Sequence, residues 1–599
     1  MQKYNNRNEV PEEYKWDLTP YFKDSKAFDD SIVKCKENID LLKNYVGCTK
    51  EPDKLYEFLV HQIETIALWQ DLYVYANLLY DQELGIEENI VKKNETDNLL
   101  NEYNLNTSFF APELLKLTKE EYENLFKECS KLEEFRADLD KTYREKEHIL
   151  SENEEKIVSE LVNAMNHYED MSSNMLNSEH DYGKIKIDGD SVVIAPNNYR
   201  RLMKNKDVNI RKKIYKSFNK VLDRYSGSNA QYLNGYVSMN NSLAKIRRFK
   251  DSWDSRLFDL NLSDKVFKTL VNVTESNVNV LQKYFNLKRE ALGLDVLNMY
   301  DMPLEIAGND KEYSIKEAQE MVRNSLKPLG EEYVSRFDKI VKERHIDYCQ
   351  YKGKCSGGYS FATISQNSRI LMSYNYNIDS VSTIAHESGH NVHHQYVNEN
   401  NKLQYRFTPS IVAEVISLTN EILLSEYLVN EGNTKEEKLS GLANILGVVA
   451  SNFYGAVREG KMEQDMYKHV HKGGTLTKEL LGKMTRKGLK KYYGNAVKLD
   501  KYVNNSWINR NHYYMHFYLY SYAICISVAL SVASKILKGD KDTLNKYYEF
   551  MKCGSDMWPK DVFMVLGVDL EDKKVYEEAI SYFDTLIDKY YKIMREEVK

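Results

Sequence analysis

The sequence predicts a mostly α-helical protein. Its 599 residues include only 9 Pro and 26 Gly, so the residues that interrupt regular structure are few. Apolar residues also recur three and four positions apart among Lys and Glu, which is typical of amphipathic helices that pack on one another. Examples are the runs Phe58, Leu59, Ile63 and Ile157, Leu161, Met165.

Two short stretches depart from the helical pattern. Residues 182–195 alternate apolar and polar side chains around Asp188-Gly189, which predicts a β-hairpin. Residues 356–374 are rich in β-branched and aromatic residues, which predicts a second hairpin or sheet edge. We place a boundary near the first hairpin, between an N-terminal helical region, residues 1–190, and a C-terminal region, residues 191–599.

Composition argues against several functional classes. The chain has 83 Lys+Arg and 90 Asp+Glu, and the resulting net charge of −7 argues against a nucleic-acid binder. The start, Met1 to Asp17, lacks the apolar core of a secretory signal, and the apolar run Ala523 to Ala533 is shorter than the roughly 20 residues that span a bilayer. The seven cysteines include no Cys-x-x-Cys pair, which fits a reducing compartment. We therefore expect a cytoplasmic protein with neither a nucleic-acid nor a membrane partner.

The central motif is His386-Glu387-Ser388-Gly389-His390. Residues four apart on a helix share a face, so both imidazoles can bind one metal ion with Glu387 beside it as a general base. Asp379 or Ser380 is expected to cap this helix. The competing interpretation is a pair of surface histidines that flank a solvated Glu.

A hydrolytic zinc site needs a third protein ligand and an open position for water. His393 lies on the same helix face, but it is about 10 Å from His386 along the helix axis. Glu414 is the favoured ligand, because a lone carboxylate in an apolar stretch needs a partner.

Glu414 belongs to a second predicted helix. Thr408-Pro409 has the pattern of an N-cap followed by the first helical residue, and the helix is expected over Ser410–Leu428. Glu421, seven positions after Glu414, shares its face. It can either hold a metal ligand in place or form a surface salt bridge.

Residues 507–522 are rich in His and Tyr, including His512, Tyr514 and Tyr520. In a zinc peptidase such side chains can donate hydrogen bonds to the oxyanion that forms when water adds to the carbonyl. The competing interpretation is an aromatic segment that fills the core.

Taken in order, these motifs resemble the oligoendopeptidase F group of the M3 (thimet oligopeptidase-like) family of zinc metallopeptidases, over most of the chain. The matching segments are Trp16-Asp17-Leu18, Ile370-Leu371-Met372, the His386–His390 motif, Glu414 to Ser417, Asn420-Glu421, His512 to Tyr522 and Gly567 to Leu570. The chain departs from the family pattern at Ser373, Asn511 and Ile524-Cys525.

The resemblance implies an almost all-α, two-lobed body that encloses a deep substrate channel, with a small β-sheet beside the zinc helix. It implies one Zn2+ held by His386, His390 and Glu414, and hydrolysis of internal bonds in short, unstructured oligopeptides. Glu387 would be the general base, and His512 with Tyr514 or Tyr520 would stabilise the oxyanion.

Two other functions stay open at this point. One is a catalytically inactive peptide-binding protein that keeps the channel. The other is a zinc carboxypeptidase, which needs a cation for the terminal carboxylate; Arg510 is the candidate.

Overall fold

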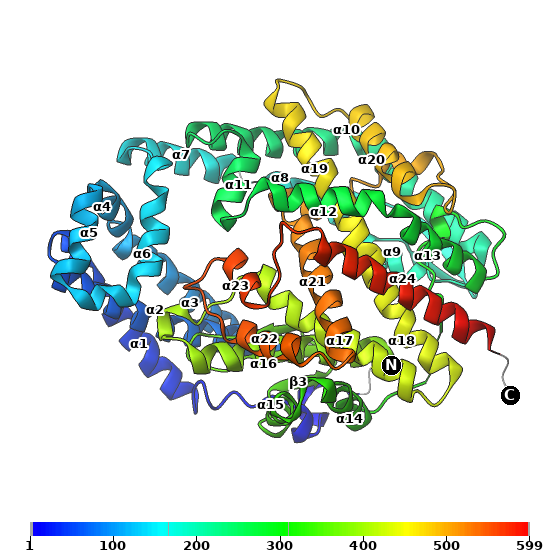
Figure 1. Cartoon of the computed structure of the whole chain (residues 1–599), viewed down its shortest axis with the longest axis horizontal. Coiled ribbons are helices and arrows are strands. Elements are labelled where there is room, and N and C mark those ends of the chain that lie inside the picture. Colours follow the sequence, from blue (N-terminus) through cyan, green and yellow to red (C-terminus); the bar gives the residue numbers. More distant parts are fainter. Residues whose placement is uncertain (1–3, 166, 309–310, 597–599) are drawn as a thin grey trace. The chain divides into compact units, whose positions relative to one another are not determined.

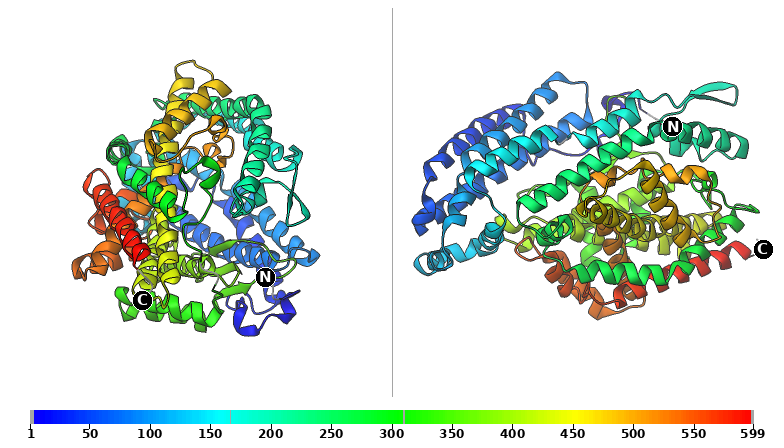
Figure 2. Two further views of the ribbon diagram at one scale, coloured as in Figure 1. Left: turned by 90° about the vertical axis from the view of Figure 1, so that its right-hand side faces the viewer. Right: turned by 90° about the horizontal axis from the view of Figure 1, so that it is seen from above.

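The computed structural model describes residues 4–165, 167–308 and 311–596. Helices dominate this part of the chain, so the predicted mostly α fold class is confirmed (Figures 1 and 2). The chain forms two compact units of three segments each: unit 1 contains residues 1–149, 310–424 and 536–567, and unit 2 contains residues 150–309, 425–535 and 568–599. The boundary predicted near residue 190 lies inside unit 2, so the regions 1–190 and 191–599 remain a sequence-based interpretation.

Unit 1 combines an N-terminal set of helices with the helices of the central motif. The first set is α1 (Ser25–Leu42), α2 (Pro52–Gln82), α3 (Glu87–Thr107), α4 (Phe110–Lys116), α5 (Lys119–Glu128) and α6 (Arg136–Tyr143). The others are α14 (Ile315–Ser325), α15 (Glu331–Lys342), α16 (Ile378–Asn400), α17 (Ser410–Glu431), α22 (Lys541–Lys552) and α23 (Pro559–Val565). The unit 1 boundary falls after Leu424, so α17 continues into unit 2.

A three-stranded sheet lies beside α16, as predicted. Its strands are β3 (Ile346–Cys349), β4 (Gly358–Phe361) and β5 (Arg369–Tyr374), in the order β3-β5-β4. β3 runs parallel to β5, and β4 pairs antiparallel with β5 in the register Ser360 opposite Ile370. β4 is therefore an edge strand of this sheet, and both β4 and β5 contact α16.

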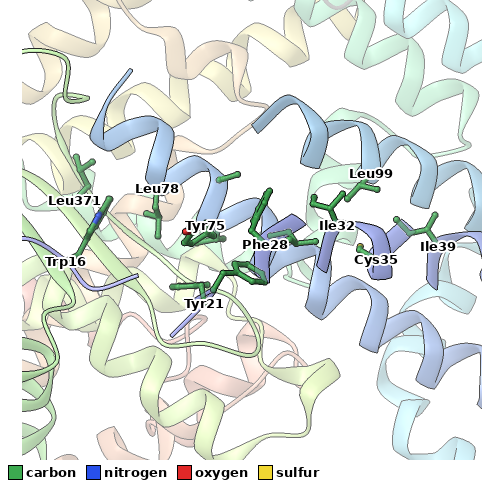
Figure 3. Packing of buried hydrophobic residues seen from close by; sticks show 14 residues of the cluster. Trp16, Tyr21, Phe28, Ile32, Cys35, Ile39, Tyr75, Leu78, Leu99 and Leu371 are labelled. Carbon is green, nitrogen blue, oxygen red and sulfur yellow. The ribbon is translucent and has the colours of Figure 1, made fainter. Parts of the chain in front are cut away.

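Helices α1, α2 and α3 of unit 1 share one apolar core (Figure 3). Phe28, Ile32 and Cys35 lie three or four positions apart on α1 and are buried against Tyr75 of α2 and Leu99 of α3. Trp16 extends the same core to Leu371 of β5, so the segment before α1 packs on the sheet. This packing matches the helical periodicity of the sequence.

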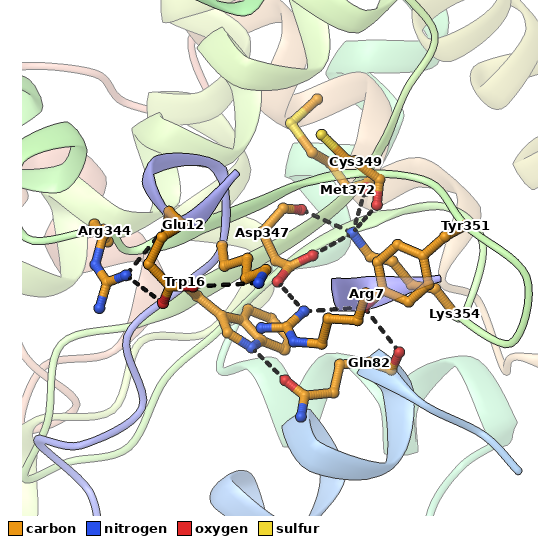
Figure 4. A network of polar contacts seen from close by, with 11 residues as sticks. Arg7, Glu12, Trp16, Gln82, Arg344, Asp347, Cys349, Tyr351, Lys354 and Met372 are labelled. Carbon is orange, nitrogen blue, oxygen red and sulfur yellow. Dashed lines mark hydrogen bonds and ion pairs between the residues drawn. The ribbon is translucent and has the colours of Figure 1, made fainter. Parts of the chain in front are cut away.

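A buried cation fixes the turn that leads into β4 (Figure 4). The Lys354 ammonium donates to the Asp347 carboxylate at 2.6 Å and to the carbonyl oxygens of Cys349 and Met372 at 2.9 Å each. Arg7 donates to the second carboxylate oxygen of Asp347 at 2.5 Å. Because a buried charge is costly unless it is paired, these contacts define the geometry of β3 and β5 and attach the N-terminal segment to them.

Unit 2 is also built mainly from helices, which differ widely in length. They are α7 (Glu152–Met165), α8 (Tyr168–Asn174), α9 (Pro196–Leu202), α10 (Val208–Ile246), α11 (Ser252–Leu260), α12 (Asp264–Ser276), α13 (Val278–Ala291), α18 (Lys435–Val448), α19 (Ala456–His471), α20 (Lys478–Tyr493), α21 (Leu519–Leu537) and α24 (Lys574–Arg595). The predicted hairpin is present as β1 (Lys184–Ile187) and β2 (Asp190–Val193). Asp188 and Gly189 both have positive φ, which is the two-residue turn that an Asp-Gly pair favours.

Two details of unit 2 differ from the sequence prediction. Ile157, Leu161 and Met165 of α7 are 61, 55 and 40% exposed, so this apolar stripe is not buried in a core as predicted. The apolar run Ala523 to Ala533 lies within α21. This helix has 19 residues and therefore extends beyond the run at both ends.

By length and composition alone, two helical stretches could cross a membrane, Lys435–His471 and Leu519–Leu537. The apolar window of the first is 56% buried and that of the second is 89% buried inside the structure. Burial of this extent is typical of core helices, and α21 in particular supplies apolar side chains to the interior.

We expect Lys354→Met to lower the free energy of unfolding by about 3 to 5 kcal/mol, because it leaves the Asp347 carboxylate buried with one charged partner fewer. Denaturant unfolding measures this difference. Lys352→Met, two residues away at an exposed position, is the matched control and should change stability little. Equal stabilities of the two variants would contradict the role assigned to Lys354.

Candidate metal centre

Helix α16 places His386 and His390 one turn apart. The helix begins after Asn377, whose side chain accepts a hydrogen bond from the Ser380 N–H, so Asn377 is the cap instead of the predicted Asp379 or Ser380. The Nε2 atoms of the two histidines lie 3.3 Å apart, and both rings are partly buried. The predicted helical spacing therefore brings both ring nitrogens to one point.

Glu414 on α17 completes a group of three. Its Oε2 atom lies 3.6 Å from His386 Nε2 and 3.9 Å from His390 Nε2. α17 begins at Ser410, as predicted, but its first hydrogen bonds are accepted by the carbonyl oxygen of Pro409. The predicted Thr408 cap is not made, since its hydroxyl is buried with no partner among the described residues.

These three donors fit a tetrahedral metal ion. An ion about 2.0 to 2.1 Å from each ligand separates two ligands by roughly 3.3 Å, close to the distances observed here. Within the described part of the chain, this is the one group of three His, Cys, Asp or Glu side chains with donor atoms close enough to share an ion. His393, the alternative third ligand, is not in the group; its Nε2 is buried elsewhere on α16.

Glu421 orients the first histidine. Its Oε1 atom lies 2.6 Å from His386 Nδ1, and Ser382 donates to its Oε2 at 3.2 Å. A proton on Nδ1 leaves the Nε2 lone pair free for a metal. Burial lowers the pKa of His386, but the hydrogen bond to Glu421 and the negative charges of Glu421, Glu387 and Glu414 together outweigh it and raise the pKa to about 9. Since the Glu421 side chain is only 12% exposed, its contact with His386 is not a surface salt bridge, and it fixes the ring of this candidate ligand.

The two helices approach closely at Gly389. A Cβ atom at this position would lie 2.8 Å from Ser417 Cα and 3.0 Å from Ser417 N on α17, closer than side chains are found. Asn420 strengthens the contact, because its amide donates to the Ala385 carbonyl oxygen at 3.0 Å. This packing brings Glu414 and Glu421 within reach of α16.

Sequence reasoning gave no role to Ser417, Ser382 or Asn420. Ser417 donates to Glu414 Oε2 at 3.1 Å and so orients the third candidate ligand. Ser417 and Ser382 lie three positions after Glu414 and four before His386, and this helical spacing was the available signal. The contact of Asn420 with the other helix has no comparable signal in the sequence.

Glu387 lies on α16 beneath the edge strand β4. It is buried, and burial raises the pKa of its carboxyl to about 7, with the nearby Glu414 acting in the same direction. The backbone N–H of Ser360 in β4 acts in the opposite direction. β4 comes this close because Gly358 has no side chain, since a Cβ atom there would lie 2.8 Å from Thr383 on α16.

The remaining predicted site residues lie in unit 2. The His512 ring is half-buried with its centroid 5.7 Å from that of Tyr522, and the Tyr514 ring lies 5.3 Å from that of Tyr236. Tyr520 is buried against Trp253, and its hydroxyl has no hydrogen-bond partner among the described residues. The roles predicted for these three residues stay predictions.

Comparison with known proteins decides the family. Residues 201–582 match the family described as "Peptidase family M3", and residues 113–182 match the one described as "Oligopeptidase F". The chain belongs to peptidase family M3. It is therefore an enzyme, a peptidase related to the metalloendopeptidases of the oligoendopeptidase F group, as the motifs predicted.

Relatives match almost the whole chain. "Oligopeptidase PepF" of Bacillus subtilis (strain 168) is 28% identical over 592 residues, which is 98% of this chain and 88% of that protein. Among solved structures, a putative peptidase from Chlamydophila abortus has a TM-score of 0.90 at 25% identity and covers 99% of this chain and 100% of that one. Oligoendopeptidase-F from Enterococcus faecium shares the fold, with a TM-score of 0.74 at 23% identity over 96% of this chain and 99% of that one.

Gly389→Ala should weaken metal binding, because the added methyl group pushes α17 and Glu414 away from the two histidines. We expect metal affinity to fall by about 10-fold or more, the size of effect seen when the support of a ligand is lost. Competition with a chelator measures this affinity. Gly447→Ala on α18, where a Cβ atom meets nothing within 4 Å, is the matched control. Equal metal affinity of both variants would show that metal binding does not need the close approach of α16 and α17.

Glu421→Gln should reduce metal affinity by about 10- to 100-fold, since it removes the carboxylate that fixes the ring of His386. The same chelator competition measures the change. Glu431→Gln, at an exposed position of the same helix, should leave affinity unchanged. Metal binding of Glu421→Gln at wild-type strength would remove Glu421 from the site.

Proposed function

We propose that the protein is a zinc-dependent endopeptidase that hydrolyses internal bonds of short, unstructured oligopeptides. The observation that carries this proposal is the group of His386 Nε2, His390 Nε2 and Glu414 Oε2, whose mutual distances of 3.3, 3.6 and 3.9 Å suit one ion. Two imidazoles and one carboxylate are the donor set of many hydrolytic zinc sites. Glu387 lies between the two histidines in the chain, at the position of the general base in this zinc motif.

A zinc ion bound there would supply Lewis acidity toward a peptide carbonyl and toward the attacking water. Glu387 then accepts the proton of the attacking water and delivers it to the leaving amine. Its burial under β4 keeps bulk water from its carboxylate, and the Ser360 N–H helps to orient it. Glu421 keeps the His386 ring in the tautomer that presents Nε2.

His512, Tyr514 and Tyr520 are proposed to donate hydrogen bonds to the oxyanion, on the strength of the sequence motif. Of the three, His512 and Tyr514 suit this role better, because both are partly exposed whereas Tyr520 is buried. Alanine variants of each would separate their contributions to kcat.

The family and the composition support the proposed substrate and compartment. β4 is an edge strand beside Glu387, and an extended peptide could pair with it through backbone hydrogen bonds, with little dependence on its sequence. No disulfide joins any of the seven cysteines, all of which lie in the described part of the chain, and this fits the proposed cytoplasmic location. The names of the relatives, oligopeptidase and oligoendopeptidase, agree with oligopeptides as substrates.

A carboxypeptidase is less well supported. Its candidate cation, Arg510, forms an ion pair with Glu459 at 2.9 Å, so a terminal carboxylate would have to compete with a neighbouring carboxylate for the guanidinium. A peptide blocked at both ends distinguishes the two activities, since only an endopeptidase cleaves it.

We expect the wild type to cleave a doubly blocked, internally quenched peptide of about ten residues and Glu387→Gln to lose about 3 kcal/mol or more of transition-state stabilisation. Zinc content should be equal in both proteins, because Glu387 is not a proposed ligand. Glu399→Gln, later on the same helix, is the control and should retain full activity. An active Glu387→Gln, or a zinc-loaded wild type that leaves the blocked peptide intact, would contradict the proposal.

A further inference from the structure

The loop that carries His512 and Tyr514 ends in unusual backbone. The segment 510–518 contains a short helix, Asn511–Tyr514, and precedes α21. Its last turn has φ +38° at His516 and φ +61° at Phe517, although neither residue is glycine. Residues with a side chain adopt this left-handed region rarely, and for a bulky residue such as Phe517 it is unfavourable unless the surrounding structure stabilises it. Some contact must therefore stabilise the end of this loop.

Glu463 of α19 supplies that contact. Its Oε1 atom accepts the backbone N–H of Phe517 at 2.7 Å, and its side chain is fully buried. The Phe517 ring packs against Trp253 and Tyr467, with centroid distances of 4.9 and 4.4 Å. Since a buried N–H without a partner is costly, the carboxyl of Glu463 favours the left-handed conformation over alternatives that turn this N–H away.

The same face of α19 holds the rest of the loop. Glu459, one turn before Glu463, pairs with Arg510 at the start of the loop at 2.9 Å. Between these two contacts, the Tyr513 hydroxyl lies 3.6 Å from the sulfur of Met462. His512 and Tyr514 lie between the two ends of the loop that α19 anchors.

We propose that Glu463 positions His512 and Tyr514 for catalysis by holding the left-handed end of residues 510–518 against α19. The proposal rests on the proposed function, in which these two side chains act on the oxyanion. Glu463 contacts no reacting atom in this scheme, because its carboxyl is buried and bonded to backbone. It is thus a positioning residue.

The chemistry of the contact between Glu463 and Phe517 indicates which substitution should preserve it. Burial raises the pKa of Glu463 to about 8, so near neutral pH the acid is largely protonated and its carbonyl oxygen accepts the Phe517 N–H. Gln keeps an amide oxygen at the same distance along the side chain. Leu has a similar volume but no acceptor.

The experiment compares Glu463→Gln, Glu463→Leu and the control Asp465→Asn, a partly exposed position on the same helix. Amide hydrogen exchange at Phe517 reports the contact directly, and kcat, KM and zinc content are measured on the full chain. Glu463→Leu should lose protection at Phe517 and lower kcat by about 100-fold, with KM and zinc content little changed. Glu463→Gln and Asp465→Asn should remain close to wild type. Glu463→Met provides the same comparison if the Leu variant does not fold.

A second arm adds His512→Ala to each variant. If Glu463 acts through the loop, Glu463→Leu should lower kcat much less in the His512→Ala background than in the wild type. Full additivity of the two changes, or equal kcat in Glu463→Leu and Glu463→Gln, would overturn the proposal.

The same measurements distinguish failure of the proposed function from failure of the role proposed for Glu463. If His512→Ala and Tyr514→Ala each retain wild-type kcat, the oxyanion assignment is wrong and the positioning role falls with it. If those variants lose activity while Glu463→Leu keeps both kcat and Phe517 protection, only the role of Glu463 is wrong.

Discussion

The close packing of α16 on α17 is the constraint on which the candidate metal centre depends. The two histidines come from one helix, so their spacing is set by local geometry alone. The carboxylates come from the other helix, and they reach the histidines because Gly389 lets the backbone of Ser417 approach. Asn420 adds a hydrogen bond across the same contact. A contact between two backbones thus sets the distances from Glu414 to the two histidines, its fellow candidate ligands.

Buried polar groups with specific partners also fix the local geometry of segments outside the candidate metal centre. Lys354 ties β3 to β5, and β5 in turn carries the edge strand β4 that covers Glu387. In unit 2, Glu463 holds the end of the loop that carries His512. Each of these groups would be costly to bury alone, so each contact favours one local geometry. The polar interior of the protein therefore serves to position side chains as well as to stabilise the fold.

The sequence predicts the parts of this structure that depend on local rules. The helical fold follows from periodicity, the hairpin at Asp188-Gly189 from turn chemistry, and the shared face of His386 and His390 from their spacing. Glu414 was predictable because a lone carboxylate in an apolar helix needs a partner.

The rest depends on contacts between distant segments. The role of Glu421 stayed open because the rotation of α17 against α16 is set by packing at Gly389, which a single sequence does not reveal. The exposed stripe of Ile157 and Leu161 on α7 shows that an apolar periodicity predicts a helix but not what covers it. The positioning role of Glu463 had no signal in the sequence, since its partner is a backbone N–H more than fifty positions away.

The central claim is that one zinc ion is held by two histidines of α16 and one carboxylate of α17. Anomalous diffraction at the zinc edge, from crystals of the full chain, tests it most directly. The account predicts one peak about 2.0 to 2.2 Å from His386 Nε2, His390 Nε2 and a carboxylate oxygen of Glu414. A peak with His393 as the third ligand, or no peak in zinc-supplemented crystals, would contradict it.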